Sequence, residues 1–377
     1  MRKIINNIKN NAVLYISGIL AIASCFAVTP DKQYIDYINF RVLSILFCLM
    51  LIVAALGHAG TFDVLTNKLL SKVKSYRGIS LLMSVMAFFM SMFLTNDVSL
   101  VTLIPFAILV LAPFGEDRKF MFTLIIMTVA ANLGSMLTPI GNPQNLYLYD
   151  TYKVPLTDFL LLMLPYSALA LIVIIAMTFL LICGSNKLPD AQKTEVKKLP
   201  AVKIVIYAAL FILNILTVIG LVHFLISLAV TAAVLAVMDR KSFLKADYNL
   251  LLTFVVFFVL IGNIGRIDMI TGALSGLVSK YPVPAAILSS QIISNVPAAM
   301  LLSAFTEDGK SLIIGTNLGG LGTIIASMAS LITYRFHASY AMTHKTAGQK
   351  QENYLLNFTI INIVTLALLF GLYMVLR

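Results

Sequence analysis

The sequence predicts an all-α, polytopic membrane protein, and three observations point to this fold class. Hydrophobic residues make up 60% of the 377 residues and charged residues only 11%, whereas soluble domains carry about 25% charged residues. Apolar runs of roughly 20 residues, long enough to cross a bilayer as a helix, recur along the whole chain. The polar stretches between them are no longer than linkers, and the alternating pattern of outer-membrane strands is missing.

The apolar runs predict nine crossings and two helical hairpins that enter and leave the membrane on the same side. A basic start at residues 1–10 gives the first run some likeness to a signal peptide, but the topology requires it as a retained span. In chain order we expect spans at 11–29 and 42–60, a hairpin at 79–112, spans at 120–147, 159–183, 203–221, 223–238 and 249–265, a second hairpin at 283–305, and spans at 311–334 and 355–376.

Basic residues fix the expected orientation of these spans. With the N-terminus in the cytoplasm, 20 of the 27 Lys and Arg residues fall in cytoplasmic segments, as the positive-inside rule requires. Counting the first hairpin as a full crossing would invert every later loop and remove this bias. We therefore predict a multi-pass protein of the cytoplasmic (inner) membrane with its C-terminus outside. Its net charge of +11 is spread over short loops, so its surroundings are the lipid bilayer and not nucleic acid.

The first hairpin is predicted from Thr95-Asn96-Asp97, a polar tripeptide inside an apolar run. Each flank has about 15 apolar residues, or roughly 23 Å of helix, which is short for a hydrocarbon core about 30 Å thick. Asp97 is the one acidic residue deep in an apolar stretch, where an ionisable side chain is costly and is a functional candidate by default. The alternative is a structural role, in which a protonated Asp97 caps the next helix.

The second hairpin carries Ser294-Asn295-Val296-Pro297 at its tip and repeats the pattern of the first. Each hairpin is followed by a span with a matching interruption, Asn132-Leu133-Gly134 and then Asn317-Leu318-Gly319. We therefore expect a first repeat at 1–183, a linker with an inverting transmembrane helix at 184–222, and a second, inverted repeat at 223–377. Inverted repeats with broken helices that meet near the midplane are typical of secondary transporters.

Polar residues at the four interruptions are the candidate site for substrate and ions. Helices that begin inside the membrane present unpaired N–H groups and a positive dipole end, which attract an anion without Lys or Arg. Amide, hydroxyl and freed carbonyl oxygens suit Na⁺, and Asp97 could neutralise that cation or carry a proton. Helix capping and helix packing are the structural alternatives for these residues. The candidates are Thr95, Asn96, Asp97, Asn132, Thr138, Gly141, Asn142, Pro143, Asn145, Ser294, Asn295, Pro297, Thr316, Asn317, Gly319 and Gly320, with Gln144 and Gln291 as weaker ones.

The remaining patterns point away from an enzyme or an ATP-driven pump. The three cysteines and four histidines have neither metal-ligand nor disulfide spacing, and the apolar runs hold no acid–base cluster. Gly309-Lys310-Ser311 lacks the first glycine and the preceding strand of a phosphate-binding loop. We expect no cofactor, and no bound metal apart from Na⁺ at Thr95, Asn96, Asp97 and Asn132.

At its interruptions the sequence resembles the ion transporter superfamily, which includes arsenite permeases, sodium/proton antiporters, citrate transporters and sodium-coupled dicarboxylate symporters. The resemblance covers nearly the whole chain and is nearest to the bacterial arsenite-permease-like anion transporter branch. The motifs that carry it are Leu94-Thr95-Asn96-Asp97, Ala131-Asn132-Leu133-Gly134-Ser135, Thr138-Pro139-Ile140-Gly141-Asn142-Pro143-Gln144-Asn145, Ser294-Asn295-Val296-Pro297 and Asn317-Leu318-Gly319-Gly320.

The resemblance implies a homodimer in which a transport domain with both hairpins moves like an elevator against a scaffold domain. In the dicarboxylate symporters each tip reads Ser-Asn-Thr and binds Na⁺ and a carboxylate. Here that Thr is missing from both tips, and Asp97 favours proton coupling, one tighter cation site or a smaller substrate.

The function predicted from the sequence is secondary active transport of a small anion, a carboxylate or an oxyanion, coupled to Na⁺ or H⁺. Efflux of arsenite or antimonite, or Na⁺/H⁺ antiport, is the alternative within the same class. A passive anion channel is the alternative from another class.

Overall fold

All regular elements of the described residues are helices, as expected. The computed structural model describes residues 12–62, 64, 68, 73, 75–111, 114, 117–183, 201–267, 275–276, 278–343 and 353–377. Within them, six helices are long and apolar enough to cross a membrane, and five shorter apolar helices have 10–17 residues. The chain therefore has the composition and the helix lengths of a multi-pass membrane protein.

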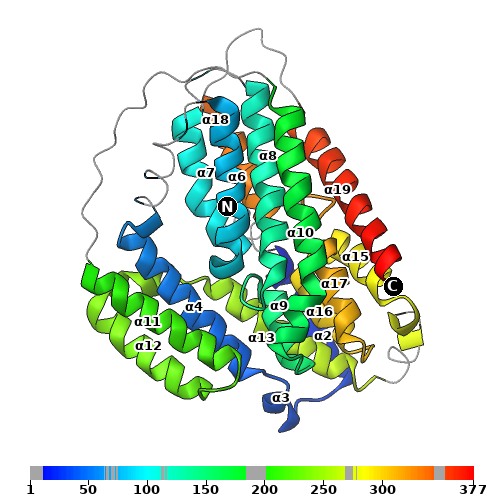
Figure 1. The fold of residues 1–377 in the computed structure, drawn as a ribbon. Helices are drawn as coiled ribbons and strands as arrows, with labels where there is room; N and C mark the ends of the chain where they lie inside the picture. Colours follow the sequence, from blue (N-terminus) through cyan, green and yellow to red (C-terminus); the bar gives the residue numbers. More distant parts are fainter. Residues whose placement is uncertain are drawn as a thin grey trace.

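The helices form two groups (Figure 1). The first, which we call the hairpin bundle, contains α6 (Tyr76–Leu94), α7 (Asn96–Leu111), α8 (Asp117–Gly134), η2 (Ser135–Leu137), α9 (Pro143–Thr151), α10 (Leu156–Leu181), α15 (Pro282–Ile293), α16 (Asn295–Ser303), α17 (Gly309–Gly319), α18 (Met328–Thr343) and α19 (Tyr354–Leu376). The second, the flanking bundle, contains α2 (Ala12–Ala27), α3 (Gln33–Asp36), α4 (Phe40–His58), α11 (Ala201–Val218), α12 (Phe224–Met238), η3 (Arg240–Leu244) and α13 (Tyr248–Ile264).

Most of the extensive helix packing lies within one group, although α13 contacts α16 of the hairpin bundle as well as α4 of its own group. In the hairpin bundle α6 packs on α8 and α15 packs on α17, while in the flanking bundle α2 packs on α13 and α4 packs between α11 and α12. The two bundles meet where α4 contacts α9 and where α13 contacts α16. Figure 1 shows α4, α11 and α12 together at the lower left, with α6, α7, α8, α10 and α18 rising above them.

Polar side chains fix the starts of several helices. Asn39 caps α4 by accepting a hydrogen bond from the N–H of Val42, and Ser75 caps α6 through the N–H of Gly78. Such caps satisfy N–H groups that have no partner inside the helix. The cap at Ser75 starts α6 at Tyr76, ahead of the predicted residue 79. The first arm is therefore 19 residues, or about 28 Å, which corrects the expectation of two short arms.

The interruptions also differ in length from the predicted ones. One residue, Thr95, separates α6 from α7, and one residue, Ser294, separates α15 from α16, so that Asn96 and Asp97 already belong to a helix. After α17, residues 320–327 are non-helical, and α18 continues to Thr343 instead of ending at 334.

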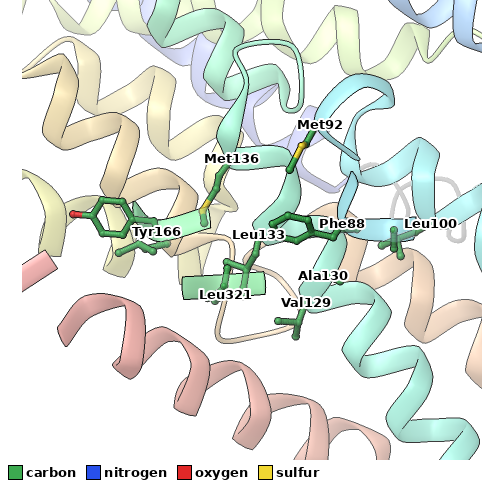
Figure 2. Close-up of a cluster of buried hydrophobic side chains, with 14 of the residues drawn as sticks. Phe88, Met92, Leu100, Val129, Ala130, Leu133, Met136, Tyr166 and Leu321 are labelled. Atoms are coloured by element: carbon green, nitrogen blue, oxygen red, sulfur yellow. The ribbon is translucent and has the colours of Figure 1, made fainter. Parts of the chain in front are cut away.

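Apolar side chains fill the hairpin bundle next to these interruptions. Phe88 of α6, Leu100 of α7 and Leu133 of α8 are at most 2% exposed and belong to one buried cluster. Figure 2 shows Leu321, from the segment after α17, within the same cluster. Tightly packed, buried apolar side chains thus surround the polar interruptions.

Candidate functional site

The backbone takes the same unusual conformation at the two hairpin tips. Thr95 has φ 70° and ψ 154°, and Ser294 has φ 73° and ψ 156°. This region of φ and ψ is almost restricted to glycine, and a residue with a side chain is strained there by roughly 1–3 kcal/mol. Because the two residues have nearly the same backbone angles, both tips have the same geometry, and the Asn that follows starts a new helix.

At the first tip, the side chain of Asn96 forms hydrogen bonds to α8 and to the segment that precedes α18. Its Nδ2 donates to Oδ1 of Asn132 in α8 at 2.9 Å and to Oγ of Ser327, before α18, at 3.4 Å. Ser327 Oγ also donates to Asn132 Oδ1 at 3.0 Å, and Asn132 Nδ2 donates to Oγ of Ser330 at 3.4 Å. All four residues are buried, so these bonds form away from bulk water.

The second tip reaches the same segment from the other hairpin. The N–H of Asn295 donates to the carbonyl oxygen of Ala326 at 3.0 Å, and Ser294 Oγ donates to that oxygen at 3.3 Å. Because Ser327 is the next residue, both hairpin tips are hydrogen-bonded to one dipeptide, Ala326-Ser327. The structure therefore brings Asn96 and Asn295 into one neighbourhood, as the sequence predicts.

The start of α9 is tied to the second interrupted span. Asn317 Nδ2 of α17 donates to Oδ1 of Asn145 at 2.7 Å, and Asn142 Nδ2 donates to Oγ of Ser135 at 2.5 Å. Asn145 Nδ2 in turn lies 3.3 Å from the Ser135 carbonyl oxygen and 3.2 Å from that of Thr138, which also accepts a hydrogen bond from the N–H of Gly141. The asparagines of the two interrupted spans thus form one buried polar layer.

Several predicted residues form hydrogen bonds to the backbone or stabilise helix starts, and take no part in the hydrogen bonds of this layer. Thr138 Oγ1 donates to the Met92 carbonyl oxygen at the end of α6, and Thr316 Oγ1 donates to the Leu312 carbonyl oxygen within α17. Pro143 is the first residue of α9 and Pro297 lies in the first turn of α16, where a missing N–H costs nothing.

Three predicted glycines allow close approach between elements. A side chain at Gly141 would collide with the Ser135 carbonyl oxygen, and one at Gly319 would collide with Ser290 of α15. Gly320 lies close to Nδ2 of Asn295.

Several buried polar side-chain atoms at the interruptions have no hydrogen-bond partner among the described residues, and others are spread over helices such as α10, α13 and α19. Those at the interruptions include Oδ1 of Asp97, Oγ of Ser99, Oδ1 of Asn142, both amide atoms of Gln144, and Oδ1 of Asn317. Buried polar groups are normally hydrogen-bonded, so these atoms at the interruptions favour a bound ligand, ion or water.

The predicted Na⁺ ligands are only partly free to bind an ion. Asn132 Oδ1 already accepts two hydrogen bonds, and Asn96 Oδ1 accepts one from the N–H of Asp97 at 2.9 Å. The Thr95 carbonyl oxygen accepts a hydrogen bond from the N–H of Ser99 at 3.1 Å. Asp97 Oδ1 and Ser99 Oγ are buried oxygens at this tip without a hydrogen-bond partner among the described residues, and both suit a hard cation.

Sequence reasoning missed three serines, Ser327, Ser330 and Ser135, that pair with the predicted asparagines. Single serines are common in membrane helices, so composition alone gave no signal for the first two. Ser135 lies inside a predicted motif, and its position one residue after Gly134 was the available signal.

Gln291, a weaker candidate, holds the non-helical segment after α17. Its Nε2 donates to the carbonyl oxygens of Gly319 at 3.0 Å and Leu321 at 2.9 Å, and its Oε1 accepts from the N–H of Thr323 at 2.9 Å. One side chain therefore satisfies three backbone groups of the segment that leads to the hairpin tips.

We expect Gln291→Leu to lower the free energy of unfolding by about 2–4 kcal/mol, because it leaves buried backbone groups without partners. The unfolding midpoint of the purified protein measures this loss. Gln33→Leu, at an exposed position of α3, is the matched control and should have little effect. Equal midpoints for the two variants would contradict the assigned contact.

Comparison with known proteins places the chain among transporters. The family described as citrate transporter matches residues 4–308. An uncharacterized transporter of Methanocaldococcus jannaschii is 34% identical over 303 residues, which cover 79% of this chain and 81% of the relative. Inner membrane protein YbiR of Escherichia coli is 30% identical over 321 residues, covering 83% and 84%. Silicon efflux transporter LSI3 of Oryza sativa is 32% identical over 138 residues, covering 37% and 28%.

Proposed function

Because the chain belongs to the citrate transporter family, we propose that it is a secondary active transporter of a small anion in the cytoplasmic membrane. The observation that carries this proposal is the meeting of both hairpin tips on Ala326-Ser327. A carboxylate or an oxyanion is the proposed substrate, and Na⁺ or H⁺ is the proposed coupling ion.

The electrostatics of the polar layer support an anionic substrate. The helices α7, α9 and α16 all begin there, and a helix start carries a partial positive charge and N–H groups that have no partner inside the helix. Among the described residues, none of the hydrogen bonds of this layer involves Lys or Arg. A carboxylate or an oxyanion could therefore bind through backbone N–H groups and asparagine amides.

Asp97 supports coupling to a cation. It lies in the first turn of α7, and its buried Oδ1 has no hydrogen-bond partner among the residues that the structure describes. An anion entering beside an ionised Asp97 would be repelled unless Na⁺ or a proton neutralised that carboxylate. Binding of the cation and of the anion would then depend on each other, which is the requirement for coupled transport.

An inverted repeat at 1–183 and 223–377, with re-entrant hairpins, is the architecture we propose. The equal backbone angles of Thr95 and Ser294 support it. So does the matching packing of α6 on α8 and of α15 on α17. The inverting helix of the proposed linker region, 184–222, is α11.

We propose further that the hairpin bundle moves against the flanking bundle, as an elevator does, with a cytoplasmic N-terminus and a homodimeric assembly. Every hydrogen bond of the polar layer joins elements of the hairpin bundle, so the site could move intact. The flanking bundle touches the first tip through an apolar cluster of Val53, Phe62 and Leu94, which can slide without breaking hydrogen bonds.

Uptake by purified protein in proteoliposomes tests coupling directly. We expect saturable accumulation of citrate, another small carboxylate or an oxyanion when Na⁺ or H⁺ is at a tenfold higher concentration outside. For coupling to one ion, such a gradient supports up to about tenfold accumulation. Protein-free vesicles and vesicles with a dissipated gradient are the controls. Non-saturable flux that ignores both gradients would instead identify a passive anion channel.

Export of a neutral metalloid acid such as arsenite or antimonite is the second candidate. Two observations favour it: one relative is named a silicon efflux transporter, and no Lys or Arg of the described part of the chain takes part in the hydrogen bonds of the polar layer. Expression in a metalloid-sensitive host distinguishes the candidates, because an exporter of this kind raises arsenite tolerance and a carboxylate importer does not. Na⁺/H⁺ antiport would appear as Na⁺-driven proton movement without any anion.

A further inference from the structure

A polar network joins the far end of α9 to the flanking bundle. Asp150, in the last turn of α9, is buried and forms a close ion pair with Arg41 of α4. Its Oδ2 accepts a hydrogen bond from Asn39 Nδ2 at 2.6 Å. Arg41 Nη2 also donates to the carbonyl oxygens of Thr217 at 3.0 Å and Val218 at 3.1 Å, at the end of α11. Three helices from two bundles therefore meet on one ion pair.

The partners in this network divide along the boundary between the bundles. Lys153 lies on the same side as Asp150, with Nζ 3.3 Å from Oδ1, and it would move with α9. Arg41 would keep the two α11 carbonyl oxygens, whose position at a helix end favours a cation. If the bundles separated, each charged group would retain a partner of its own. The pair can therefore open without leaving an uncompensated buried charge.

The surroundings also allow the pair to open. A cavity of about 620 Å³ is lined by Asn39, Arg41, Asp150 and Lys153, among others. Water that enters this cavity could hydrate both charges after separation. Other charged contacts between described residues lie within single bundles: Lys310–Asp158 joins α17 to α10, Arg266–Asp31 joins the end of α13 to the segment before α3, and His58–Asp239 joins the ends of α4 and α12.

We propose that the Arg41–Asp150 pair is a latch that holds the hairpin bundle in the observed position and must open before the bundle can move. This inference rests on the proposed elevator motion. Arg41 is then a positioning residue: it sets the equilibrium between two positions of the bundle and has no contact with the substrate.

Cross-linking between the bundles reports the position without relying on transport. We suggest a Val53→Cys/Leu94→Cys pair in a chain whose Cys25, Cys48 and Cys183 are replaced by Ala, because Val53 of α4 and Leu94 of α6 share one apolar cluster. A short bifunctional maleimide should cross-link this pair in the observed position. The yield at a fixed time measures how much of the protein occupies that position.

Arg41→Gln should shift the equilibrium away from the observed position by roughly tenfold and lower the cross-linking yield accordingly. Asp158→Asn, which breaks the pair inside the hairpin bundle, should leave the yield unchanged. Asp150→Asn serves if Arg41→Gln is not recovered as folded protein, and Arg41→Lys should restore part of the yield.

Two results would contradict the latch, and they differ in whether the elevator motion survives. A yield that responds to an imposed ion gradient but is the same in Arg41→Gln and the parent would disprove the latch and leave the elevator standing. A yield that ignores the gradient, together with full transport after cross-linking, would disprove the elevator motion and the latch with it.

Discussion

Asp97→Asn should abolish gradient-driven accumulation of the anion while leaving a folded protein. The substitution keeps the size of the side chain but removes its negative charge and its ability to bind a proton. Because Oδ1 is buried and has no partner among the described residues, bulk water weakens its interaction with a cation less than at an exposed position. A loss of about 3 kcal/mol at this position corresponds to a roughly hundredfold lower coupled rate. Proteoliposome uptake under Na⁺ and H⁺ gradients measures it.

The matched control is Asp158→Asn, whose side chain is 44% exposed at the start of α10. It should transport like the parent. A structural role gives a different result: if Asp97 only caps α7, Asp97→Asn lowers the unfolding midpoint but retains accumulation. Transport by Asp97→Asn at the parent rate would contradict the coupling role.

Gly134→Ala should destabilise the packing of α8 on α6 in the hairpin bundle. The added Cβ would collide with the carbonyl oxygen of Phe88 in α6 and with Oγ of Ser91. Shifting the backbone in a packed core costs energy, so we expect the free energy of unfolding to fall by about 3 kcal/mol. This loss should appear as a lower unfolding midpoint and a lower yield of folded protein.

Gly371→Ala in α19 is the control, because nothing lies within 4 Å of its added Cβ. Alanine favours helix over glycine, so this variant should be slightly more stable than the parent. If Gly134→Ala unfolded at the same temperature as Gly371→Ala, the close contact of α8 with α6 would be wrong.

The helical class and the positions of the interruptions could be read from the sequence, because both depend on local patterns. Long apolar runs set the spans, and a polar Asn after a hydroxyl residue set the two tips at Thr95 and Ser294. The length of the first arm could not be read in the same way, because it depends on the cap at Ser75 outside the apolar run.

Pairs of residues that are far apart in the chain could not be predicted from the sequence. Arg41 and Asp150 are 109 residues apart, and nothing local to either residue names the other. The charge pattern that predicts the orientation of the spans treats Arg41 only as a charge next to a span and does not show its role between helices. The strained backbone at Thr95 was also hidden, since Thr rarely adopts a positive φ and no glycine marked the place.

The shared dipeptide Ala326-Ser327 has a mechanical consequence for fidelity. Since Asn96 and Asn295 both hold it, a displacement of one tip pulls on the other through two residues of chain. A site that holds only the coupling ion or only the substrate anion would then leave both hairpin tips out of position. If transport is coupled as proposed, this short connection would suppress slippage, in which the ion crosses without the anion and its gradient is dissipated.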